Sequence, residues 1–208
     1  YAESLGNPKL DVLDLKAISE IAKKAKVPFI VDNTVASPAL LNPIEHGANI
    51  VIHSLTKYLT GNGTSIGGVI IDAGTFDWGN GNFPEFTEPN PSYHGLNYHE
   101  ALGNIAFIAK ARVEGLRDFG SAPSPFNSFQ TIQGIETLDI RMKKHSENAL
   151  KLAAWLSTRE EVAWVNYPGL KTSKYNTLAK QYLAKGQSGI LTFGLKSGFE
   201  AGKKVADH

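Results

Sequence analysis

The feature that most constrains this chain is a short apolar strand that ends near a lysine. Residues 50–52 read Ile-Val-Ile, which is typical of a strand buried on both faces of a parallel sheet. Ser54, Thr56 and Lys57 follow at once, and a glycine-containing loop comes next. A lysine amine can form a Schiff base, and hydroxyls can donate to a phosphate. The stretch therefore predicts a site for an anionic ligand with a carbonyl group, although a solvated lysine is the simpler interpretation of Lys57 alone.

A second apolar strand favours the binding-site interpretation, because it ends at an acid. Residues 28–31 read Pro-Phe-Ile-Val, and Asp32 follows. Consecutive parallel strands present their carboxyl ends to one crevice, so Asp32 is expected to face the group formed by Ser54, Thr56 and Lys57. A carboxylate, two hydroxyls and an amine can hold the ring nitrogen, the phosphate and the aldehyde of pyridoxal phosphate. We therefore predict a site for this cofactor.

The order of the predicted elements indicates an α/β fold. A helix is expected from its cap, Asp14, through Lys26, with Leu15, Ile18, Ala22 and Ala25 on one face. Alternation of helix and strand over the first 57 residues predicts a mostly parallel sheet flanked by helices. Farther along we expect a strand at 67–72, a long loop at 78–95, a helix at 100–119, a helix at 129–157 interrupted at Gly134, strands at 162–165 and 190–194, and a helix at 174–185 between them.

Composition excludes several classes of function. The 208 residues carry a net charge of +1, which argues against a nucleic-acid partner or an anionic membrane surface. No apolar run reaches the ~18 residues of a membrane span, so the cytoplasm is the expected compartment. The chain has no cysteine, and His94 and His99 lack the spacing of a helical ligand pair, so no metal site is predicted.

The motifs resemble the cysteine/methionine-metabolism family of fold-type-I pyridoxal-phosphate enzymes. The resemblance rests on residues 3–8 (Glu-Ser-Leu-Gly-Asn-Pro), 32–34 (Asp-Asn-Thr), 37–38 and 47–58, and it covers nearly the whole chain. Within this family, the aromatic segment at residues 76–95 resembles an insertion of the O-acetylhomoserine sulfhydrylases that the cystathionine lyases lack. One departure is Asn62, where the family usually has histidine.

The resemblance implies an aspartate-aminotransferase-like fold in two domains. Residues 1–130 would form the C-terminal part of the large cofactor-binding domain, and residues 131–208 the first part of a smaller C-terminal α+β domain. The chain is then expected to be an internal fragment of a longer protein that works as a homo-dimer or homo-tetramer.

The resemblance also implies a reaction and a role for each site residue. The reaction would replace the acetate of O-acetylhomoserine by sulfide, giving homocysteine and acetate. Lys57 would bind the aldehyde as a Schiff base and move protons, and Asp32 would keep the ring nitrogen protonated. The remaining expected contacts are Ser54 and Thr56 to the phosphate, Asn7 to the phenolic oxygen, and Thr34 to the side of the ring that faces Asp32. Arg112, Arg117 and Arg141 receive no role.

Several alternatives remain open at this point. Cystathionine γ-synthase, cystathionine lyase and methionine γ-lyase would share the Lys57 chemistry. A scaffold that keeps only the fold would lack the yellow colour of a lysine-bound cofactor. Residues 63–67 match the G-x-S-x-G motif of serine hydrolases, but the predicted strand that follows does not provide the helix that this motif requires.

Overall fold

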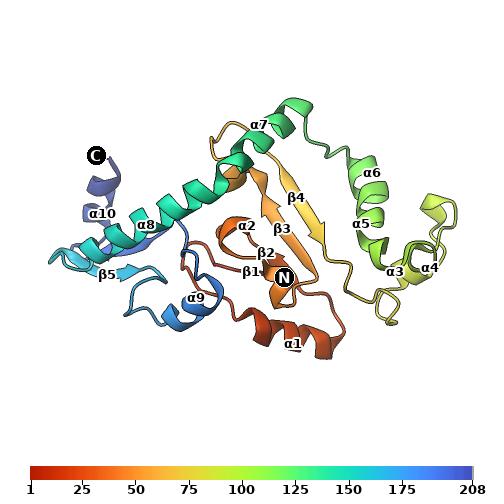
Figure 1. The fold of residues 1–208 in the computed structure, drawn as a ribbon, viewed down its shortest axis with the longest axis horizontal. Coiled ribbons are helices and arrows are strands. Elements are labelled where there is room, and N and C mark those ends of the chain that lie inside the picture. The colour runs from red at the N-terminus through yellow and green to blue at the C-terminus, as the bar shows by residue number, and fades with distance from the viewer. Residues whose placement is uncertain (208) are drawn as a thin grey trace.

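The first part of the fold is a four-stranded mixed sheet. The computed structural model describes residues 1–207. Strands β1 (Ala2–Glu3), β2 (Ile30–Asp32), β3 (Ile50–Ser54) and β4 (Gly68–Asp72) lie side by side in that order (Figure 1). The pairs β1–β2 and β2–β3 are parallel, and β4 runs antiparallel to β3. The predicted α/β fold with a mostly parallel sheet is confirmed.

The two strands that lead into the predicted site occupy the middle of this sheet. Val31, Ile50 and Val51 are at most 3% exposed, as expected for strands covered on both faces. In the register, Asp32 pairs with Ile52. The carboxyl ends of β2 and β3 therefore meet at one edge of the sheet, while the two-residue strand β1, too short for a sequence pattern to reveal, covers the other side of β2.

Helix α1 (Leu15–Ala25) confirms the predicted first helix. Asp14 accepts a hydrogen bond from the backbone N–H of Ala17 at 3.2 Å, and the helix ends where Lys26 takes a left-handed conformation (φ 55°). Leu15, Ile18 and Ala22 pack into the core beneath the sheet, whereas Ala25 is exposed. The connection from β2 to β3 contains two short helical segments, α2 (Ser37–Leu40) and η1 (Pro43–His46).

The segment after β4 is more ordered than the sequence suggested. The expected loop at 78–95 contains two short helical turns, and the expected helix at 100–119 begins at Tyr98 and is broken at Gly103, where φ is 54°. Trp78 stacks on Phe86 and Phe107 at the centre of a separate apolar cluster. The elements are α3 (Pro84–Thr87), η3 (Pro91–Tyr93), α4 (Tyr98–Leu102), η4 (Gly103–Ile105), α5 (Ala106–Lys110), η5 (Ala111–Leu116) and α6 (Arg117–Phe119).

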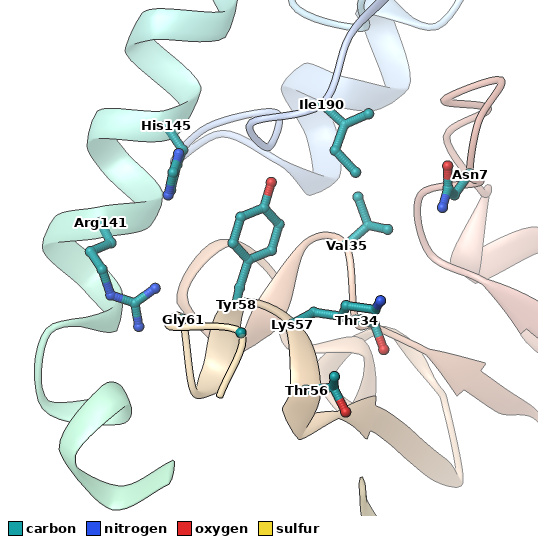
Figure 2. Close-up of a pocket in the computed structure, with 11 residues that line it drawn as sticks. Asn7, Thr34, Val35, Thr56, Lys57, Tyr58, Gly61, Arg141, His145 and Ile190 are labelled. Atoms are coloured by element: carbon teal, nitrogen blue, oxygen red, sulfur yellow. The ribbon is translucent and has the colours of Figure 1, made fainter. Parts of the chain in front are cut away.

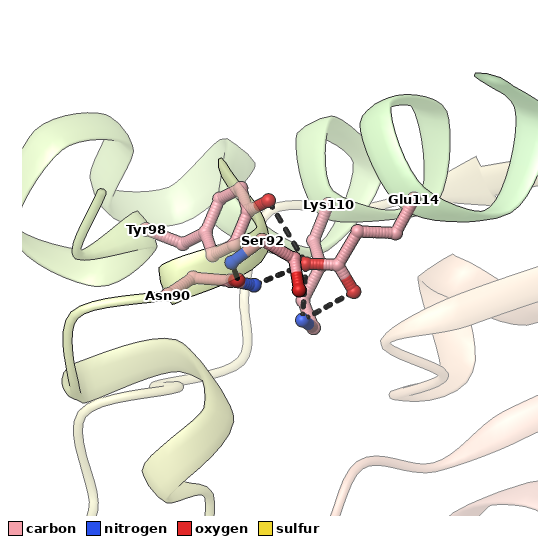
Figure 3. A network of polar contacts seen from close by, with 5 residues as sticks. All are labelled: Asn90, Ser92, Tyr98, Lys110 and Glu114. Atoms are coloured by element: carbon pink, nitrogen blue, oxygen red, sulfur yellow. Dashed lines mark hydrogen bonds and ion pairs between the residues drawn. The ribbon is translucent and has the colours of Figure 1, made fainter. Parts of the chain in front are cut away.

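A polar network around Glu114 joins Asn90, next to η3, to helices α4, α5 and η5 (Figure 3). Lys110 Nζ donates to both Glu114 carboxylate oxygens at 2.7 and 2.6 Å, the Tyr98 hydroxyl donates at 3.0 Å, and the Asn90 amide also donates. Burial alone would raise the pKa of Glu114, but the bonds from Lys110 and Tyr98 outweigh it and lower that pKa. Burial and the same carboxylate raise the pKa of Tyr98 to about 12. The network thus holds an ionised glutamate and a neutral tyrosine.

Two helices lead from the sheet to the C-terminal elements, and one prediction about them is wrong. Helix α7 (Pro125–Glu136) begins four residues earlier than expected, with Ser124 as its cap. The interruption expected at Gly134 lies instead at Thr137, before α8 (Leu138–Leu156). Gly134 continues the helix, and a Cβ built there would lie 2.2 Å from the carbonyl oxygen of Thr60. The glycine therefore serves close packing, not a helix break.

The remaining elements form a small second sheet at the far end of α8 (Figure 1). Strands β5 (Val162–Asn166) and β6 (Thr192–Leu195) pair antiparallel. Helix α9 (Asn176–Tyr182) lies between them in the sequence, and helix α10 (Gly198–Asp207) follows β6. The predicted strands and the helix between them are thus present: β5 is one residue longer than predicted, β6 is shifted towards the C-terminus, and α9 is shorter at both ends. Among the described residues, no helix combines the length and apolar character needed to cross a membrane.

Candidate functional site

A pocket of about 490 Å³ opens at the carboxyl ends of β2 and β3. Five segments of the chain converge on it: the stretch near Asn7, the turn after β2, the turn after β3, helix α8, and the approach to β6 (Figure 2). Its lining consists of Asn7, Thr34, Val35, Thr56, Lys57, Tyr58, Gly61, Gly63, Arg141, His145 and Ile190. The structure therefore brings Asn7, Thr34, Thr56 and Lys57 of the predicted set to one pocket.

Lys57 lies on a single helical turn, η2 (Leu55–Leu59), directly after β3. The backbone of Lys57 departs from helical angles (φ −93°, ψ −126°), and the turn closes through the N–H of Gly61, which donates to the Lys57 carbonyl at 2.9 Å. In Figure 2 the lysine side chain runs across the floor of the pocket towards Thr34. Two residues, Leu55 and Thr56, thus separate the end of the strand from Lys57, and the turn sets where the amine lies.

Thr34 connects the two predicted residues that do not line the pocket, Asp32 and Ser54. Its backbone N–H donates to Asp32 Oδ1 at 2.9 Å, and its hydroxyl accepts from the backbone N–H of Ser54 at 2.8 Å. Because Thr34 itself lines the pocket, it links both strand ends to that cavity. Support of the Asp32 side of the cofactor ring by Thr34 stays a prediction.

The carboxylate of Asp32 is held ionised. Burial alone would raise the pKa of Asp32, but hydrogen bonds from Thr34 and from the Tyr1 hydroxyl (2.9 Å to Oδ2), together with nearby His53, lower it below the ordinary value. His53 is 3% exposed, and this burial lowers the pKa of its imidazole although the charge of Asp32 opposes the shift. At neutral pH the site therefore contains a negative Asp32 beside a neutral His53.

The hydroxyl of Thr56 already has a backbone partner. It accepts from the N–H of Gly67 at 3.2 Å and donates to the carbonyl of the same residue at 3.3 Å. These bonds fix the start of β4 against the Lys57 turn. The nearby Ser65 is buried, and its hydroxyl donates to Gln130. Residues 63–67 lead into strand β4, so this motif forms no strand–turn–helix nucleophile elbow.

Sequence reasoning missed the pocket wall contributed by α8. Arg141 and His145 are four residues apart and so share one helix face, and the His145 ring lies 5.4 Å from that of Tyr58. Their four-residue spacing indicates in the sequence that they share a helix face, but a single sequence does not reveal which helix face meets the sheet. The charged lining residues are Lys57 and Arg141, and no carboxylate lines the pocket in the described part of the chain. The pocket therefore favours an anionic ligand.

Comparison with known proteins agrees with this geometry. An O-acetyl-L-homoserine sulfhydrylase of Leptospira meyeri is 57% identical over the whole chain, and a homocysteine synthase of Schizosaccharomyces pombe is 47% identical, again over the whole chain. The chain spans about half the length of these relatives, 49% of each.

A solved structure gives the same fold. A candidate O-acetylhomoserine (thiol)-lyase of Campylobacter jejuni, crystallised with N'-pyridoxyl-lysine-5'-monophosphate, superposes with a TM-score of 0.94 at 39% identity, covering 99% of this chain and 52% of that one. The family of Cys/Met metabolism PLP-dependent enzymes matches residues 1–208. The pocket of the chain combines a lysine, an amide and hydroxyls beside an ionised aspartate. Because the family matches its whole length and its relatives are up to 57% identical, the chain belongs to the Cys/Met metabolism PLP-dependent enzyme family.

Proposed function

We propose that the protein containing this chain replaces the acetate group of O-acetylhomoserine by sulfide, giving homocysteine and acetate. The observation that carries the proposal is the pocket at the ends of β2 and β3, where Lys57 and Thr34 line one cavity and the backbone N–H of Thr34 donates to an ionised Asp32. The names of the relatives support this reaction over others of the family.

The side chains of the site fit pyridoxal phosphate. When bound, this cofactor supplies an electron sink for negative charge on the carbons of an amino-acid substrate. The Lys57 amine would hold its aldehyde carbon, the negative charge of Asp32 would keep its ring nitrogen protonated, and the surplus of positive charge in the lining suits its phosphate. The further contacts that we propose are from Asn7 to the phenolic oxygen and from Thr56 and Ser54 to the phosphate. Asn7 and Thr56 line the pocket, and Ser54 lies next to it through its bond to Thr34. The Thr56 hydroxyl would exchange its bond to the Gly67 carbonyl for one to the phosphate.

Each of these residues then has a task in the reaction. Lys57 takes the proton from Cα of the substrate and returns protons to carbon, as a positioned general base and acid does. Asp32 remains ionised throughout because its hydrogen bonds from Thr34 and Tyr1 favour the charged form. Thr34 fixes the direction of the carboxylate, and its bond to Ser54 keeps the two strand ends in register.

The same proposal covers organisation and location. Residues 1–130 would belong to the cofactor-binding domain and residues 131–208 to the smaller domain, a division that agrees with the separate sheets β1–β4 and β5–β6. The working protein would be a homo-dimer or homo-tetramer in the cytoplasm. Small molecules would be its ligands.

A substrate panel on the complete protein tests the reaction. O-acetylhomoserine with sulfide should give homocysteine and acetate at a rate well above release of products from cystathionine or methionine. Preference for cystathionine or methionine would replace the sulfhydrylase assignment by a lyase of the same family.

Lys57→Ala tests the site itself. Turnover should fall by more than ~10³-fold, because a positioned acid–base group is lost together with the amine that holds the cofactor. Lys24→Ala, at an exposed position of α1, is the matched control and should behave as the unaltered protein. A Lys57→Ala variant that keeps a tenth of the activity would rule out this lysine.

A further inference from the structure

The wall of the pocket formed by α8 contains a cation, Arg141, whose charge suits the phosphate but to which the proposed reaction assigns no step. We propose that Arg141 is a positioning residue: its guanidinium holds the turn that carries Lys57 against the junction of α7 and α8, and so fixes where the lysine amine lies. This inference rests on the proposed function and adds a residue to it.

The anchoring of Arg141 is specific. Nη2 donates to the carbonyl of Gly134 at 2.7 Å, and Nε donates to the Thr137 hydroxyl at 3.0 Å. Both acceptors lie at the end of α7 and the start of α8. None of the ion pairs found between described residues includes Arg141. The guanidinium is therefore bound to backbone and hydroxyl oxygens at the helix junction and not to a carboxylate.

The other face of the guanidinium touches the Lys57 turn. A Cβ built at Gly61 would lie 2.7 Å from Arg141 Nη1 and 2.8 Å from Cζ, so the backbone of Gly61 is in close contact with the planar group. Gly61 in turn closes the turn by donating to the Lys57 carbonyl. The planar side chain of Arg141 thus spans from Gly134 to Gly61, the residue that closes the turn. A flexible lysine side chain does not reproduce this pair of contacts.

Helix α7 presses on the same turn from a second direction. The Cβ position at Gly134 is 2.2 Å from the Thr60 carbonyl oxygen and 2.5 Å from that of Leu59. The hydroxyls of Thr60 and Thr131 share a buried hydrogen bond at 3.0 Å. The turn is therefore held between α7 and Arg141, and these contacts constrain residues 59–61 on both sides.

The side chain of Lys57 depends on this support. It is exposed, and none of the hydrogen bonds found between described residues fixes its amine. The backbone of the turn is then what sets the amine relative to Thr34 and Asn7. A displacement near 1 Å can reduce catalysis by ~10²-fold, so loosening the turn should be visible in turnover.

The test compares Arg141→Gln and Arg141→Lys in the complete protein, with Lys144→Gln on the exposed side of the same helix as control; Lys144 pairs only loosely with Glu147, at 3.7 Å. Besides kcat and KM, the readout is the rate at which added pyridoxal phosphate becomes fixed to Lys57 of the cofactor-free protein by borohydride, followed by mass spectrometry. Thermal unfolding reports the folded fraction.

Arg141→Gln should fix the cofactor at least ~10-fold more slowly and lose ~10–100-fold in kcat, with little change in KM. Arg141→Lys should be nearly as impaired, because it keeps the charge but not the planar fork, and it carries the test if Arg141→Gln does not fold. Equal fixation rates, full rescue by lysine, or a raised KM with normal kcat would overturn the positioning role. Failure of the unaltered protein to fix the cofactor on Lys57 would instead overturn the proposed function.

Discussion

Gly134→Ala offers the sharpest test of how α7 supports the site. The added methyl would lie 2.2 Å from the Thr60 carbonyl oxygen and 2.5 Å from that of Leu59, whereas ordinary contacts begin at 3.4 Å. Both oxygens belong to backbone that is already fixed by hydrogen bonds, so no side chain can swing away. The helix and the turn would have to separate by about 1.2 Å, the difference between 3.4 and 2.2 Å.

The expected loss of stability follows from two opposing effects. Overpacking against fixed neighbours costs typically 1–3 kcal/mol, and the backbone contacts here place Gly134→Ala at about 3 kcal/mol. Alanine in a helix interior recovers roughly 1 kcal/mol relative to glycine. The net loss of about 2 kcal/mol corresponds to a Tm lower by roughly 4–8 °C for a domain of this size.

Thermal unfolding of the complete protein measures this shift, with Gly115→Ala as control. Gly115 is also in a helical segment, but a Cβ built there has nothing within 4 Å, so its replacement should leave Tm unchanged or slightly raised. Because the separated elements carry Lys57, the Gly134 variant should also lose turnover. An unchanged or raised Tm for Gly134→Ala would refute the close contact between α7 and the turn.

Two further changes test the electrostatics. Asp32→Asn should keep the cofactor but lose most turnover. Because folding lowers the pKa of Asp32, the ionised carboxylate stabilises the fold above about pH 4. This contribution disappears as the pH falls through the lowered pKa. The Tm of the Asp32→Asn variant should therefore fall less between about pH 5 and pH 3 than the Tm of an Asp11→Asn control, which keeps Asp32. Equal decreases in Tm would contradict the pKa shift. Glu114→Gln should weaken the bonds to Lys110 and Tyr98 at a cost on the order of 1 kcal/mol, read as a Tm lower by about 2–4 °C with unchanged kcat; no change in Tm would show that this network is not stabilising.

Local chemistry made part of the site readable from sequence. Two β-branched strands end at Asp32 and near Lys57, and the connection between them is short, so their parallel pairing and shared edge follow from general rules of α/β sheets. The capped first helix was equally local, because Asp14 and the apolar spacing of α1 lie within a single stretch. The residue roles assigned by resemblance remain proposals.

Only the tertiary structure decided how that chemistry is supported. The contact of Gly134 with Thr60, the reach of Arg141 to Gly61 and the link from Asp32 through Thr34 to Ser54 join residues whose separation in sequence has no periodic pattern. A glycine in a helical stretch looks the same in the sequence whether it breaks the helix or admits a neighbouring backbone. The sequence determined which groups carry the chemistry, because strand propensity and side-chain type are local properties. Packing between distant elements decided which of those groups meet and which contacts hold them, because such contacts depend on the path of the whole chain.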